Sequence, residues 1–499
     1  MLAESLFENL DYEVICGDLS IDIKNIYNDS RKVNSDGLFF CISGANFDGH
    51  EYINDVVGKG AVCVVVQKDV EQIPGILIIK VSNTRHAMGI ISANFYGNPS
   101  KELTVIGITG TKGKTTTTYM IREMLEAAGH KTGLIGTIEI IDGKNVIPAN
   151  NTTPESIIIH RTLRDMADNG LDSVVMEVSS QGLMLDRVAG VDFDYGIFSN
   201  LSKDHIGPNE HSSFEEYAMW KSRLFTMCKT GIFNADDKHV DIMTKDATCK
   251  IVTYGINGSY DYKASEHILY SRDGHLGIEY KLSGKRNGDV LVNLPGTFSI
   301  YNSLAAIAVA DLMGVPFDKI CEILKTIKVK GRVELIPISD KFTIMIDYAH
   351  NAVSLESILE TLREYNPKRL VSLFGCGGNR SKDRRYEMGE VSGNMADLTI
   401  ITSDNPRFEE PQDIIDDIRI GIEKTDGEFI EITDRKEAIR YAIMNAREGD
   451  VIVLAGKGHE DYQEIKGEKH HMDERDLIKE ILEEEDVTKI CGYNNRYFA

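Results

Sequence analysis

The sequence predicts an α/β fold of three domains. Short apolar runs alternate with amphipathic segments along most of the chain, which is the pattern of parallel sheets covered by helices. One apolar run, 103–108, continues into a glycine-rich turn and then into a helix with apolar residues at helical spacing. The chain has 499 residues, enough for more than one core. We therefore expect a small N-terminal α/β domain at 1–98, a central parallel-sheet domain at 99–330 and a C-terminal doubly wound, Rossmann-like domain at 331–499.

The N-terminal block carries the pattern of a small α/β unit. Apolar runs at 37–44 and 61–67 predict strands, and 50–60 predicts a helix that ends in glycine. Turn residues in 96–102 mark the expected boundary with the next domain.

The central block predicts a parallel sheet, because its apolar strands are separated by helical segments. Between 251 and 295 the pattern changes to alternating, turn-rich segments, which we interpret as an antiparallel insertion. The predicted strands of the parallel sheet are 103–108, 131–138, 173–178 and 195–200.

The C-terminal block alternates strands and helices regularly, as a second doubly wound domain does. Its unusual polar residues directly follow the strands, and ligands of such sheets bind beyond the carboxyl ends of the strands. The predicted strands are 342–349, 370–375, 398–404, 429–432 and 450–456, and the predicted helices include 354–365 and 411–422.

The composition argues against several classes of partner. A formal net charge of -23 and a pI of about 5.0 disfavour nucleic acid and anionic membranes. Residues 1–13 are acidic and lack the apolar segment of a signal peptide, and no apolar run has the length of a membrane span. The eight cysteines form no CxxC pair, which indicates reduced thiols rather than a disulfide framework or a zinc site. We expect a cytoplasmic monomer without nucleic-acid or membrane partners.

The glycine-rich turn after 103–108 predicts a phosphate-binding loop. Backbone N–H groups at such a turn and at a helix N-terminus favour an anion. In this type of loop a lysine such as Lys114 reaches the β- and γ-phosphates, and a hydroxyl such as that of Thr115 binds Mg²⁺. The spacing departs from the usual pattern, since Ile108 stands where the first glycine is expected. The residues predicted to bind the phosphates of a nucleotide here, which the family resemblance described next identifies as ATP, are Gly110, Thr111, Lys112, Gly113, Lys114, Thr115 and Thr116.

The stretch GITGTKGKTTT, which contains this loop, resembles the Mur ligase superfamily, and the resemblance spans nearly the whole chain. Members of the family join amino acids to carboxylates at the expense of ATP, so the resemblance implies ATP and Mg²⁺ as cofactors. A carboxylate at the end of a buried strand, as at Glu177, is costly without a partner. The metal ligands that the resemblance implies are Thr115, Glu177 in VVMEVSSQGL, His205 in FSNLSKDHIG and Lys221, as a carbamate, in EEYAMWKSRLF.

Further motifs of the family imply nucleotide contacts and catalytic groups. LPGTFSIYNSLAA contains Asn302, which the resemblance puts near the adenine, and GRVE contains Arg332, which resembles a nucleotide-contacting arginine. IDYAHN supplies Asp347 and His350, and either is a candidate for the base that the attacking amine requires. The catalytic residues implied in total are Lys114, Glu177, His205, Lys221, Asp347 and His350.

The resemblance is closest to family members that add the third residue of the peptidoglycan stem peptide to UDP-MurNAc-L-Ala-D-Glu. The motifs YNDSRKV and GANFDG match their uridine-binding stretches, and NNTTPES matches contacts to the muramoyl peptide. The uridine motifs argue against a folylpolyglutamate synthetase, because folate enzymes lack this domain. The residues implied are Asn28, Ser30, Ala45, Asn46 and Phe47 for the nucleotide, and Asn151, Thr152, Thr153, Ser179 and Arg187 for the peptide.

The amino acid to be added is indicated by SDNPRFEEP, which resembles the motif of family members that take meso-diaminopimelate rather than L-lysine. Diaminopimelate carries a second carboxylate, which an arginine such as Arg407 binds bidentately. A carboxylate at Glu460, in AGKGHEDYQ, would receive the distal ammonium, and Arg380 would flank the site. The diaminopimelate residues implied are Arg380, Asp404, Asn405, Pro406, Arg407, Gly456 and Glu460.

The expected reaction is acyl-phosphate chemistry. The γ-phosphoryl group of ATP passes to the D-glutamyl carboxylate, and the amine of diaminopimelate then displaces phosphate to form an amide. Two alternatives stay open at this point. One is the same ligation with L-lysine. The other is a nucleotide-binding scaffold of the cell-wall machinery without catalysis, which would have no reason to keep both the metal ligands and the amino-acid residues.

Overall fold

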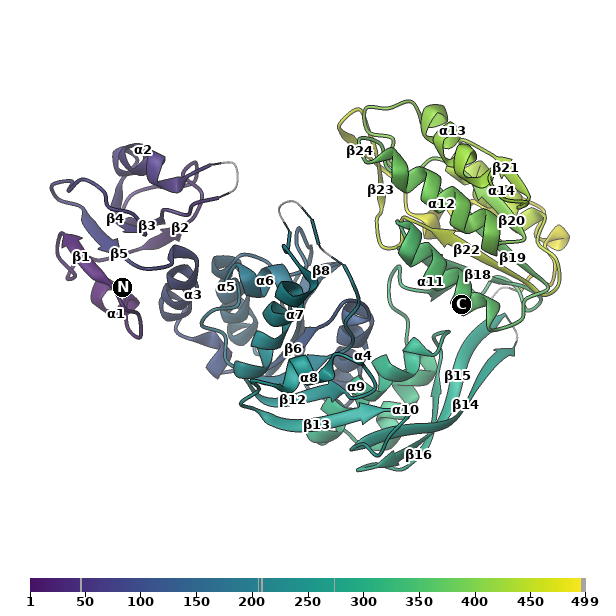
Figure 1. The fold of residues 1–499 in the computed structure, drawn as a ribbon, viewed down its shortest axis with the longest axis horizontal. Helices are drawn as coiled ribbons and strands as arrows, with labels where there is room; N and C mark the ends of the chain where they lie inside the picture. The colour runs from purple at the N-terminus through teal and green to yellow at the C-terminus, as the bar shows by residue number, and fades with distance from the viewer. Residues whose placement is uncertain (45–46, 205, 208–209, 273, 495–499) are drawn as a thin grey trace. The chain divides into compact units, whose positions relative to one another are not determined.

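The structure is a computed structural model that describes residues 1–44, 47–204, 206–207, 210–272 and 274–494 (Figure 1). The chain forms two compact units, Met1–Lys263 with Leu304–Ile320, and Ala264–Ser303 with Cys321–Ala499. Three sheets of five, eleven and six strands and one two-stranded hairpin carry the architecture, with helices between the strands. The predicted α/β class is confirmed.

The N-terminal sheet belongs to the first unit and has the order β1-β5-β4-β3-β2. Only β1 is antiparallel to its neighbour, β5, among the pairs of this sheet. The predicted strands at 37–44 and 61–67 are confirmed as β3 and β4, and the predicted helix at 50–60 is a 3-10 turn, Gly49–Tyr52, followed by α2. The elements are α1 (Ala3–Leu6), β1 (Glu13–Cys16), β2 (Asn25–Tyr27), β3 (Gly37–Phe40), α2 (Ile53–Gly58), β4 (Ala61–Val66), β5 (Leu77–Lys80) and α3 (Thr84–Phe95).

The parallel part of the central sheet lies in the same unit and has the order β13-β12-β11-β6-β10-β7. Two short strands, β8 and β9, extend it in antiparallel pairing. The strands are β6 (Thr104–Thr109), β7 (Thr132–Ile135), β8 (Glu139–Ile141), β9 (Val146–Pro148), β10 (Ser173–Glu177), β11 (Phe193–Phe198), β12 (Cys228–Asn234) and β13 (Lys250–Gly255).

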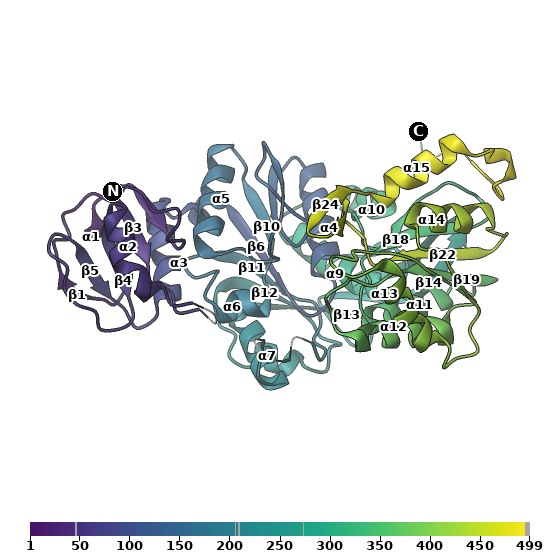
Figure 2. The ribbon, with the colours of Figure 1, turned by 90° about the horizontal axis from the view of Figure 1, so that it is seen from above.

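Helices cover both faces of this sheet, which explains why its strands are apolar throughout. Figure 2 shows α4 and α5 on opposite sides of the strands. The apolar face of α4, including Met120 and Met124, is fully buried, and Leu163 of α5 packs in a core with Val174 and Met176 of β10. The helices are α4 (Lys114–Ala127), α5 (Ser156–Asp168), α6 (Ser180–Met184), α7 (Phe214–Ser222) and α8 (Val240–Thr244).

The antiparallel insertion predicted at 251–295 is partly wrong. β13 is parallel to β12, and β14 is parallel to β13, whereas β15 and β16 form an antiparallel pair. Alternating polarity predicts strands but not their direction, and the crossover through α8 returns the chain parallel to β12. The division between the two units falls within β14 and within α9. The elements are β14 (Tyr262–Arg272), β15 (His275–Gly284), β16 (Gly288–Val292), α9 (Phe298–Leu312) and α10 (Phe317–Thr326).

The C-terminal sheet belongs to the second unit and has the order β17-β18-β22-β19-β20-β21, parallel except for β17. Side chains of α11, α12 and α13 pack on one face, and those of α14 and α15 pack on the other, as in a doubly wound domain. All five predicted strands of this block are confirmed. The strands are β17 (Glu334–Leu335), β18 (Thr343–Asp347), β19 (Arg369–Phe374), β20 (Leu398–Ile401), β21 (Phe429–Glu431) and β22 (Asp450–Ala455). The helices are α11 (Ala352–Arg363), α12 (Lys382–Met395), α13 (Pro411–Ile422), α14 (Arg435–Met444) and α15 (Glu474–Glu484).

A two-stranded hairpin, β23 (Tyr462–Ile465) and β24 (Glu468–His471), was not predicted. Its two-residue turn has Lys466 at φ 51° and Gly467 at φ 84°, the twisted turn that favours glycine. In the described part of the chain, no helix combines the length and the apolar character that a membrane crossing requires.

His160 of α5 is a fully buried histidine in the first unit. Its Nε2 lies 2.9 Å from the carbonyl oxygen of Ala189, so this nitrogen carries the proton and donates. Burial lowers the pKa of His160 to about 4. The ring is therefore neutral in the folded protein, and protonation in acid favours the unfolded chain.

We expect His160→Gln to reduce the acid sensitivity of the first unit. Because the folded pKa lies below the unfolded value, the contribution of His160 is complete above about pH 6.5 and is lost as the pH falls toward 4. At pH 5.0 the loss is about 2 kcal/mol in the wild type and absent in the variant. Urea unfolding at pH 7.5 and 5.0 measures it, with His130→Gln, a partly exposed histidine, as the control. Equal pH dependence in wild type and His160→Gln would contradict the assignment.

Candidate active site

The phosphate-binding loop occupies the four residues between β6, which ends at Thr109, and α4, which begins at Lys114. Gly110 has φ 149° and Gly113 has φ 85°, both in the region that favours glycine. A Cβ atom on Gly110 would lie 1.9 Å from Oγ of Ser199, so this backbone approach requires glycine. The loop is therefore shaped by the segment that follows β11.

Hydrogen bonds from that segment hold the loop. The N–H of Thr111 donates to the carbonyl oxygen of Asn200 (2.9 Å), and the N–H of Lys112 donates to Oδ1 of Asn200 (3.0 Å). Nδ2 of Asn200 and Oγ of Ser199 both donate to the carbonyl oxygen of Lys112, each at 2.9 Å. Asn200 and Ser199 were not among the predicted site residues.

Two lysines converge on the carbonyl oxygen of Gly110. Nζ of Lys114 donates to it at 2.9 Å and to the carbonyl oxygen of Thr111 at 3.1 Å. Nζ of Lys221, from α7, donates to the same Gly110 oxygen at 2.7 Å. The positive charge and the loop N–H groups together form an environment suited to a polyphosphate.

Lys221 is almost completely buried, with 2% of its surface exposed. Its Nζ also lies 4.6 Å from the centre of the Tyr217 ring. Burial lowers the pKa of Lys221 well below the usual value of lysine, and the charge of Lys114 lowers it further. The charge of Asp204 acts in the opposite direction and has the smallest effect of the three. A lowered pKa increases the fraction of neutral amine, which is the form that reacts with carbon dioxide.

Glu177 ends β10 and is 1% exposed. Its Oε1 accepts from Oγ1 of Thr115 (3.0 Å) and from the N–H of Thr137 (2.8 Å), and its Oε2 accepts from Oγ1 of Thr137 (3.0 Å). The predicted pair of Thr115 and Glu177 therefore lies together. His205 lies outside the described residues, and the described residues contain no cluster of three or more His, Cys, Asp or Glu able to hold a metal ion.

The residues predicted to contact the muramoyl peptide lie beside Glu177. Oγ1 of Thr153 donates to the carbonyl oxygen of Glu177 and accepts from the N–H of Ser179, both at 2.9 Å. Arg187 donates to the carbonyl oxygen of Thr153 (2.9 Å) and pairs with Glu155 (2.7 Å). Thr152 contacts Thr137 through their hydroxyls at 3.1 Å, and Asn151 is exposed.

The residues predicted to contact uridine follow two strands of the N-terminal sheet. Asn28 and Ser30 come after β2 and are partly exposed, and Phe47 is 58% exposed. Ala45 and Asn46 lie outside the described residues. Asp48, which was not predicted, accepts from the N–H of His50 at 3.1 Å and from its Nδ1 at 2.6 Å, next to this stretch.

Arg332, a predicted nucleotide contact in the second unit, lies against a cluster of aromatic rings. The guanidinium of Arg332 lies 4.6 Å from the centre of the Tyr348 ring, and the rings of His350 and His459 lie 4.6 and 4.7 Å from it. Burial and nearby cations lower the pKa of His459 to about 4, so this ring is neutral. Tyr348 and His459 were not predicted. Asn302 lies in α9 and is 4% exposed.

Asp347 and His350 differ in what they contact. Asp347 accepts backbone N–H groups from Val333 (2.8 Å) and Ala349 (2.9 Å), and burial raises its pKa. His350 is exposed, and its Nδ1 lies 2.9 Å from the carbonyl oxygen of Tyr348. Nδ1 therefore carries the proton, and Nε2 presents its lone pair to the surroundings.

The residues predicted for diaminopimelate come from the loops after β19, β20 and β22, which end at the same edge of the sheet. Arg407 has φ 52°, and its side chain is 23% exposed. Its Nε donates to Oε2 of Glu464 (3.0 Å) and its Nη1 donates to the carbonyl oxygen of Gly378 (2.7 Å). Among the described residues, Nη2 has no hydrogen-bond acceptor. The guanidinium is thus oriented with one nitrogen still able to donate.

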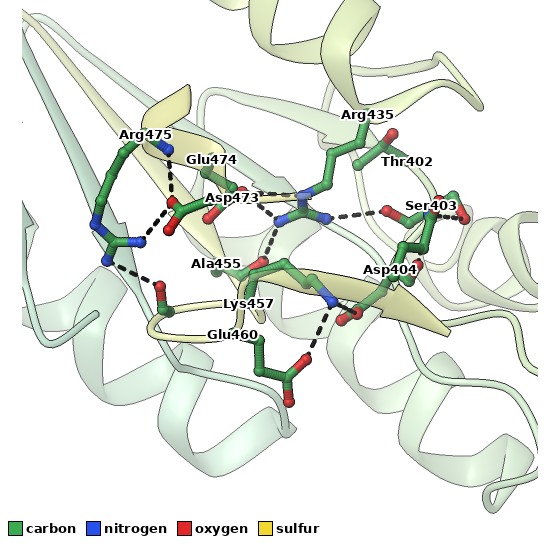
Figure 3. A network of polar contacts seen from close by, with 12 residues as sticks. Thr402, Ser403, Asp404, Arg435, Ala455, Lys457, Glu460, Asp473, Glu474 and Arg475 are labelled. Atoms are coloured by element: carbon green, nitrogen blue, oxygen red, sulfur yellow. Dashed lines mark hydrogen bonds and ion pairs between the residues drawn. The ribbon is translucent and has the colours of Figure 1, made fainter. Parts of the chain in front are cut away.

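The buried side of this region is a network of charges (Figure 3). Nζ of Lys457 donates to Oδ1 of Asn405 (2.9 Å) and to Oε2 of Glu460 (3.0 Å), and it lies 3.4 Å from Oδ1 of Asp404. Gly456 has φ 108° and precedes Lys457. The predicted residues Asp404, Asn405, Gly456 and Glu460 therefore lie together, joined by a lysine that was not predicted.

Arg380 and Pro406 complete the predicted set. Arg380 is exposed, in the loop after β19. Glu409 holds this loop by accepting from the N–H of Asn379, and Arg385 binds Glu409 through two hydrogen bonds of 2.8 Å. A Cβ atom added to Gly378 would lie only 1.9 Å from the carbonyl oxygen of Pro406, so the loops after β19 and β20 pack closely.

Three models of Mur ligase domains match the chain: the catalytic domain of the Mur ligase family over residues 22–96, the Mur ligase middle domain over 108–310 and the glutamate ligase domain over 331–458. The UDP-N-acetylmuramoyl-L-alanyl-D-glutamate--2,6-diaminopimelate ligase 1 of Clostridium acetobutylicum is 44% identical, over 97% of this chain and 100% of its own length. The chain belongs to the Mur ligase family. The resemblance seen in GITGTKGKTTT is thereby confirmed.

Solved structures of Mur ligases share the fold. A UDP-N-acetylmuramoyl-L-alanyl-D-glutamate--2,6-diaminopimelate ligase is 28% identical, covers 97% of this chain and 99% of its own, and superposes with a TM-score of 0.71. A MurF ligase from Thermotoga maritima in complex with ADP is 19% identical, covers 89% of this chain and 96% of its own, and has a TM-score of 0.58. The three-domain fold of the family is therefore that of this chain.

We expect Gly110→Ala to disrupt the phosphate-binding loop. The added methyl group meets Ser199 at a backbone conformation that alanine rarely adopts, which costs at least about 2 kcal/mol and shifts the loop N–H groups. Thermal unfolding and equilibrium binding of ATP measure the two effects.

The matched control for this substitution is Gly129→Ala. Gly129 has φ 96°, but a Cβ atom there has open space around it. It therefore isolates backbone strain from the clash, and we expect it to lower stability without weakening ATP binding. Equal ATP affinity in Gly110→Ala and the wild type would contradict the role assigned to this loop.

Proposed function

We propose that this chain catalyses the ATP-dependent addition of meso-2,6-diaminopimelate to UDP-MurNAc-L-Ala-D-Glu, forming an amide bond in peptidoglycan precursor synthesis. Relatives that are 44% identical over nearly the whole chain are UDP-N-acetylmuramoyl-L-alanyl-D-glutamate--2,6-diaminopimelate ligases, which supports this assignment. The observation that carries it is the arrangement of Arg407, Asn405 and Glu460, an oriented guanidinium with a buried amide and a half-buried carboxylate. We propose further that the enzyme acts in the cytoplasm as a monomer.

Three domains divide this work in our proposal. Residues 1–98 bind the uridine nucleotide, 99–330 bind ATP and 331–499 bind the amino acid. The ranges of the three family models, 22–96, 108–310 and 331–458, support these boundaries.

The phosphates of ATP lie on residues 110–116 in this proposal, and Arg332 and Asn302 contact the nucleoside. Thr115 and Glu177 would hold one Mg²⁺, and His205 and carbamylated Lys221 a second. The buried oxygen atoms of Thr115 and Glu177, 3.0 Å apart, fit a hard cation that prefers oxygen ligands. When bound, Mg²⁺ would offset charge on the transferring phosphoryl group.

The first step transfers the γ-phosphoryl group to the D-glutamyl carboxylate. The carboxylate oxygen forms a bond to the γ-phosphorus while the bond to the β-γ bridging oxygen breaks, giving an acyl phosphate and ADP. The ammonium of Lys114 stabilises the charge that spreads over the transferring oxygens. Arg187 and Ser179 hold the peptide beside Glu177.

The second step forms the amide. The neutral amine of diaminopimelate attacks the acyl carbon, and inorganic phosphate leaves. His350 is the better of the two candidate bases, because its Nε2 lone pair is exposed, whereas Asp347 accepts two backbone N–H groups.

Specificity for diaminopimelate over L-lysine follows from Arg407. The distal carboxylate of diaminopimelate would accept from Nη2 of Arg407, whose Nε is already paired with Glu464, and lysine offers no such acceptor. A site built to hydrogen-bond a substrate group discriminates strongly against an analogue that lacks the group.

ADP release from the purified protein tests the function. We expect ADP release only when ATP, UDP-MurNAc-L-Ala-D-Glu and diaminopimelate are all present, and much less with L-lysine in place of diaminopimelate. Equal turnover of L-lysine would favour the lysine ligase. Absence of turnover with either amino acid, despite ATP binding, would favour the non-catalytic scaffold.

We expect Arg407→Ala to lower kcat/KM for diaminopimelate roughly 100- to 1000-fold, because charged hydrogen bonds to the distal carboxylate are lost. Activity with L-lysine changes little. Arg419→Ala, which removes an arginine of α13 that pairs with Glu431, is the matched control and leaves both activities unchanged. Full diaminopimelate activity in Arg407→Ala would refute this specificity argument.

Lys221 is expected to carry a carbamate, because burial lowers the pKa of its amine and so favours the neutral, reactive form. Carbon-13 NMR of protein equilibrated with labelled bicarbonate measures this. A carbamate resonance is expected in the wild type and none at that position in Lys221→Ala, and identical spectra would remove this ligand from the proposal.

A further inference from the structure

Lys457 is a fully buried lysine in the loop after β22 (Figure 3). Its neighbours Gly456 and Gly458 have φ values of 108° and 55°. A Cβ atom on Gly456 would lie 3.0 Å from Oδ2 of Asp404, and one on Gly458 would lie 2.6 Å from Cβ of Tyr348. Two glycines therefore allow the backbone to pack tightly here while the lysine side chain points inward.

The ammonium of Lys457 has three hydrogen-bond acceptors and one further ion-pair partner. It donates to Oδ1 of Asn405 (2.9 Å), Oε2 of Glu460 (3.0 Å) and the carbonyl oxygen of Tyr462 (2.5 Å), and Oδ1 of Asp404 lies 3.4 Å away. Asp404, Asn405 and Glu460 are all residues that we assign to diaminopimelate. Lys457 itself is covered by them, so its action on a ligand is indirect.

The first effect of Lys457 is on the orientation of Asn405. Oδ1 of Asn405 accepts from both Lys457 and the N–H of Glu464 (2.9 Å), so this end of the amide must be the oxygen. Nδ2 is then directed to Oε2 of Glu460 at 2.9 Å. Lys457 and the N–H of Glu464 thus fix together which way the amide faces.

The second effect is on Glu460. Its Oε2 receives hydrogen bonds from both Lys457 and Asn405, whereas its Oε1 has no hydrogen-bond donor among the described residues. The carboxylate is held by one oxygen and presents the other. An ammonium group of the substrate would donate a hydrogen bond to Oε1.

The third effect is on charge. Asp404 and Glu460 carry two negative charges, and Lys457 carries one positive charge, which leaves one negative charge for one ammonium. Arg407 nearby is paired with Glu464 through a 3.0 Å contact. The distal ammonium of diaminopimelate matches the remaining negative charge, and its distal carboxylate would accept a hydrogen bond from Nη2 of Arg407.

We propose that Lys457 is a positioning residue for the amino acid to be added: it orients Asn405 and Glu460 and sets the charge of the site that receives the distal ammonium. This inference rests on the proposed function, since it concerns the same amino-acid site. It assigns Lys457 no contact with the substrate.

Steady-state kinetics of Lys457→Met tests the inference, because methionine keeps an unbranched stem and removes the charge. We expect KM for diaminopimelate to rise roughly 10- to 100-fold, with KM for ATP and for UDP-MurNAc-L-Ala-D-Glu within about twofold of wild type. Should Lys457→Met fail to fold, Lys457→Gln replaces it, since its amide still donates one hydrogen bond, and a smaller rise in the same KM is expected.

Arg369→Met is the matched control. Arg369 is a partly buried cation of the same sheet that pairs with Asp450 at 2.5 Å, at the amino end of β22 rather than the carboxyl end. We expect it to lower the melting temperature and leave KM for diaminopimelate unchanged.

The outcomes separate this inference from the proposed function. Absence of diaminopimelate turnover by the wild type would overturn the function itself. Wild-type turnover with an unchanged diaminopimelate KM in a folded Lys457 variant would overturn the inference alone. A uniform change in all three KM values, or the same KM rise in Arg369→Met, would show a merely structural lysine and would also overturn it.

Discussion

The candidate active site depends on how closely the backbone at Gly110 approaches the segment after β11. A Cβ atom there would lie 1.9 Å from Oγ of Ser199 and 3.1 Å from the backbone of Asn200, at a φ of 149°, so the approach strongly favours glycine. Because of this approach, Asn200 accepts a hydrogen bond from the loop, and the carbonyl oxygen of Gly110 accepts hydrogen bonds from Lys114 and Lys221. The backbone approach at Gly110 thus determines both the shape of the loop and the position of the two lysines.

In the second unit, a buried ion pair rather than a close backbone approach holds the loops that follow β20 and β22. Arg435 donates to the carbonyl oxygens of Ser403 (3.1 Å) and Ala455 (2.9 Å), at the carboxyl ends of β20 and β22, and pairs with the buried Glu474 (2.8 Å). Breaking such a pair leaves an uncompensated buried charge, which is strongly destabilising. The residues proposed for diaminopimelate therefore stand on loops that are fixed before a ligand arrives.

The sequence predicted the parts of the fold that rest on local pattern. Continuous apolar runs bounded by turns identified the strands of both doubly wound sheets, because burial on two faces demands them. The direction of β13 and β14 was predicted wrongly, since direction depends on the partner strand. The hairpin β23–β24 was missed, although Lys466-Gly467 between two short runs was a usable signal.

The candidate site was predictable to the extent that motifs are contiguous. Thr115 and Glu177, 62 positions apart, were paired through the family resemblance, and the structure brings them within 3.0 Å. Glu464 and Lys457 were missed because their partners, Arg407 and Asn405, lie more than 50 positions away and only the fold brings them together. Which of these residues bind substrate remains a prediction.

The two buried lysines illustrate why environment, rather than residue type, decides their use. Lys221 donates to a carbonyl and stands near another lysine, so burial lowers its pKa and favours the neutral, nucleophilic amine. Lys457 is equally buried but faces Asp404 and Glu460, so its charge has partners and its hydrogen bonds are committed. The first arrangement suits covalent modification, and the second suits the positioning of neighbours.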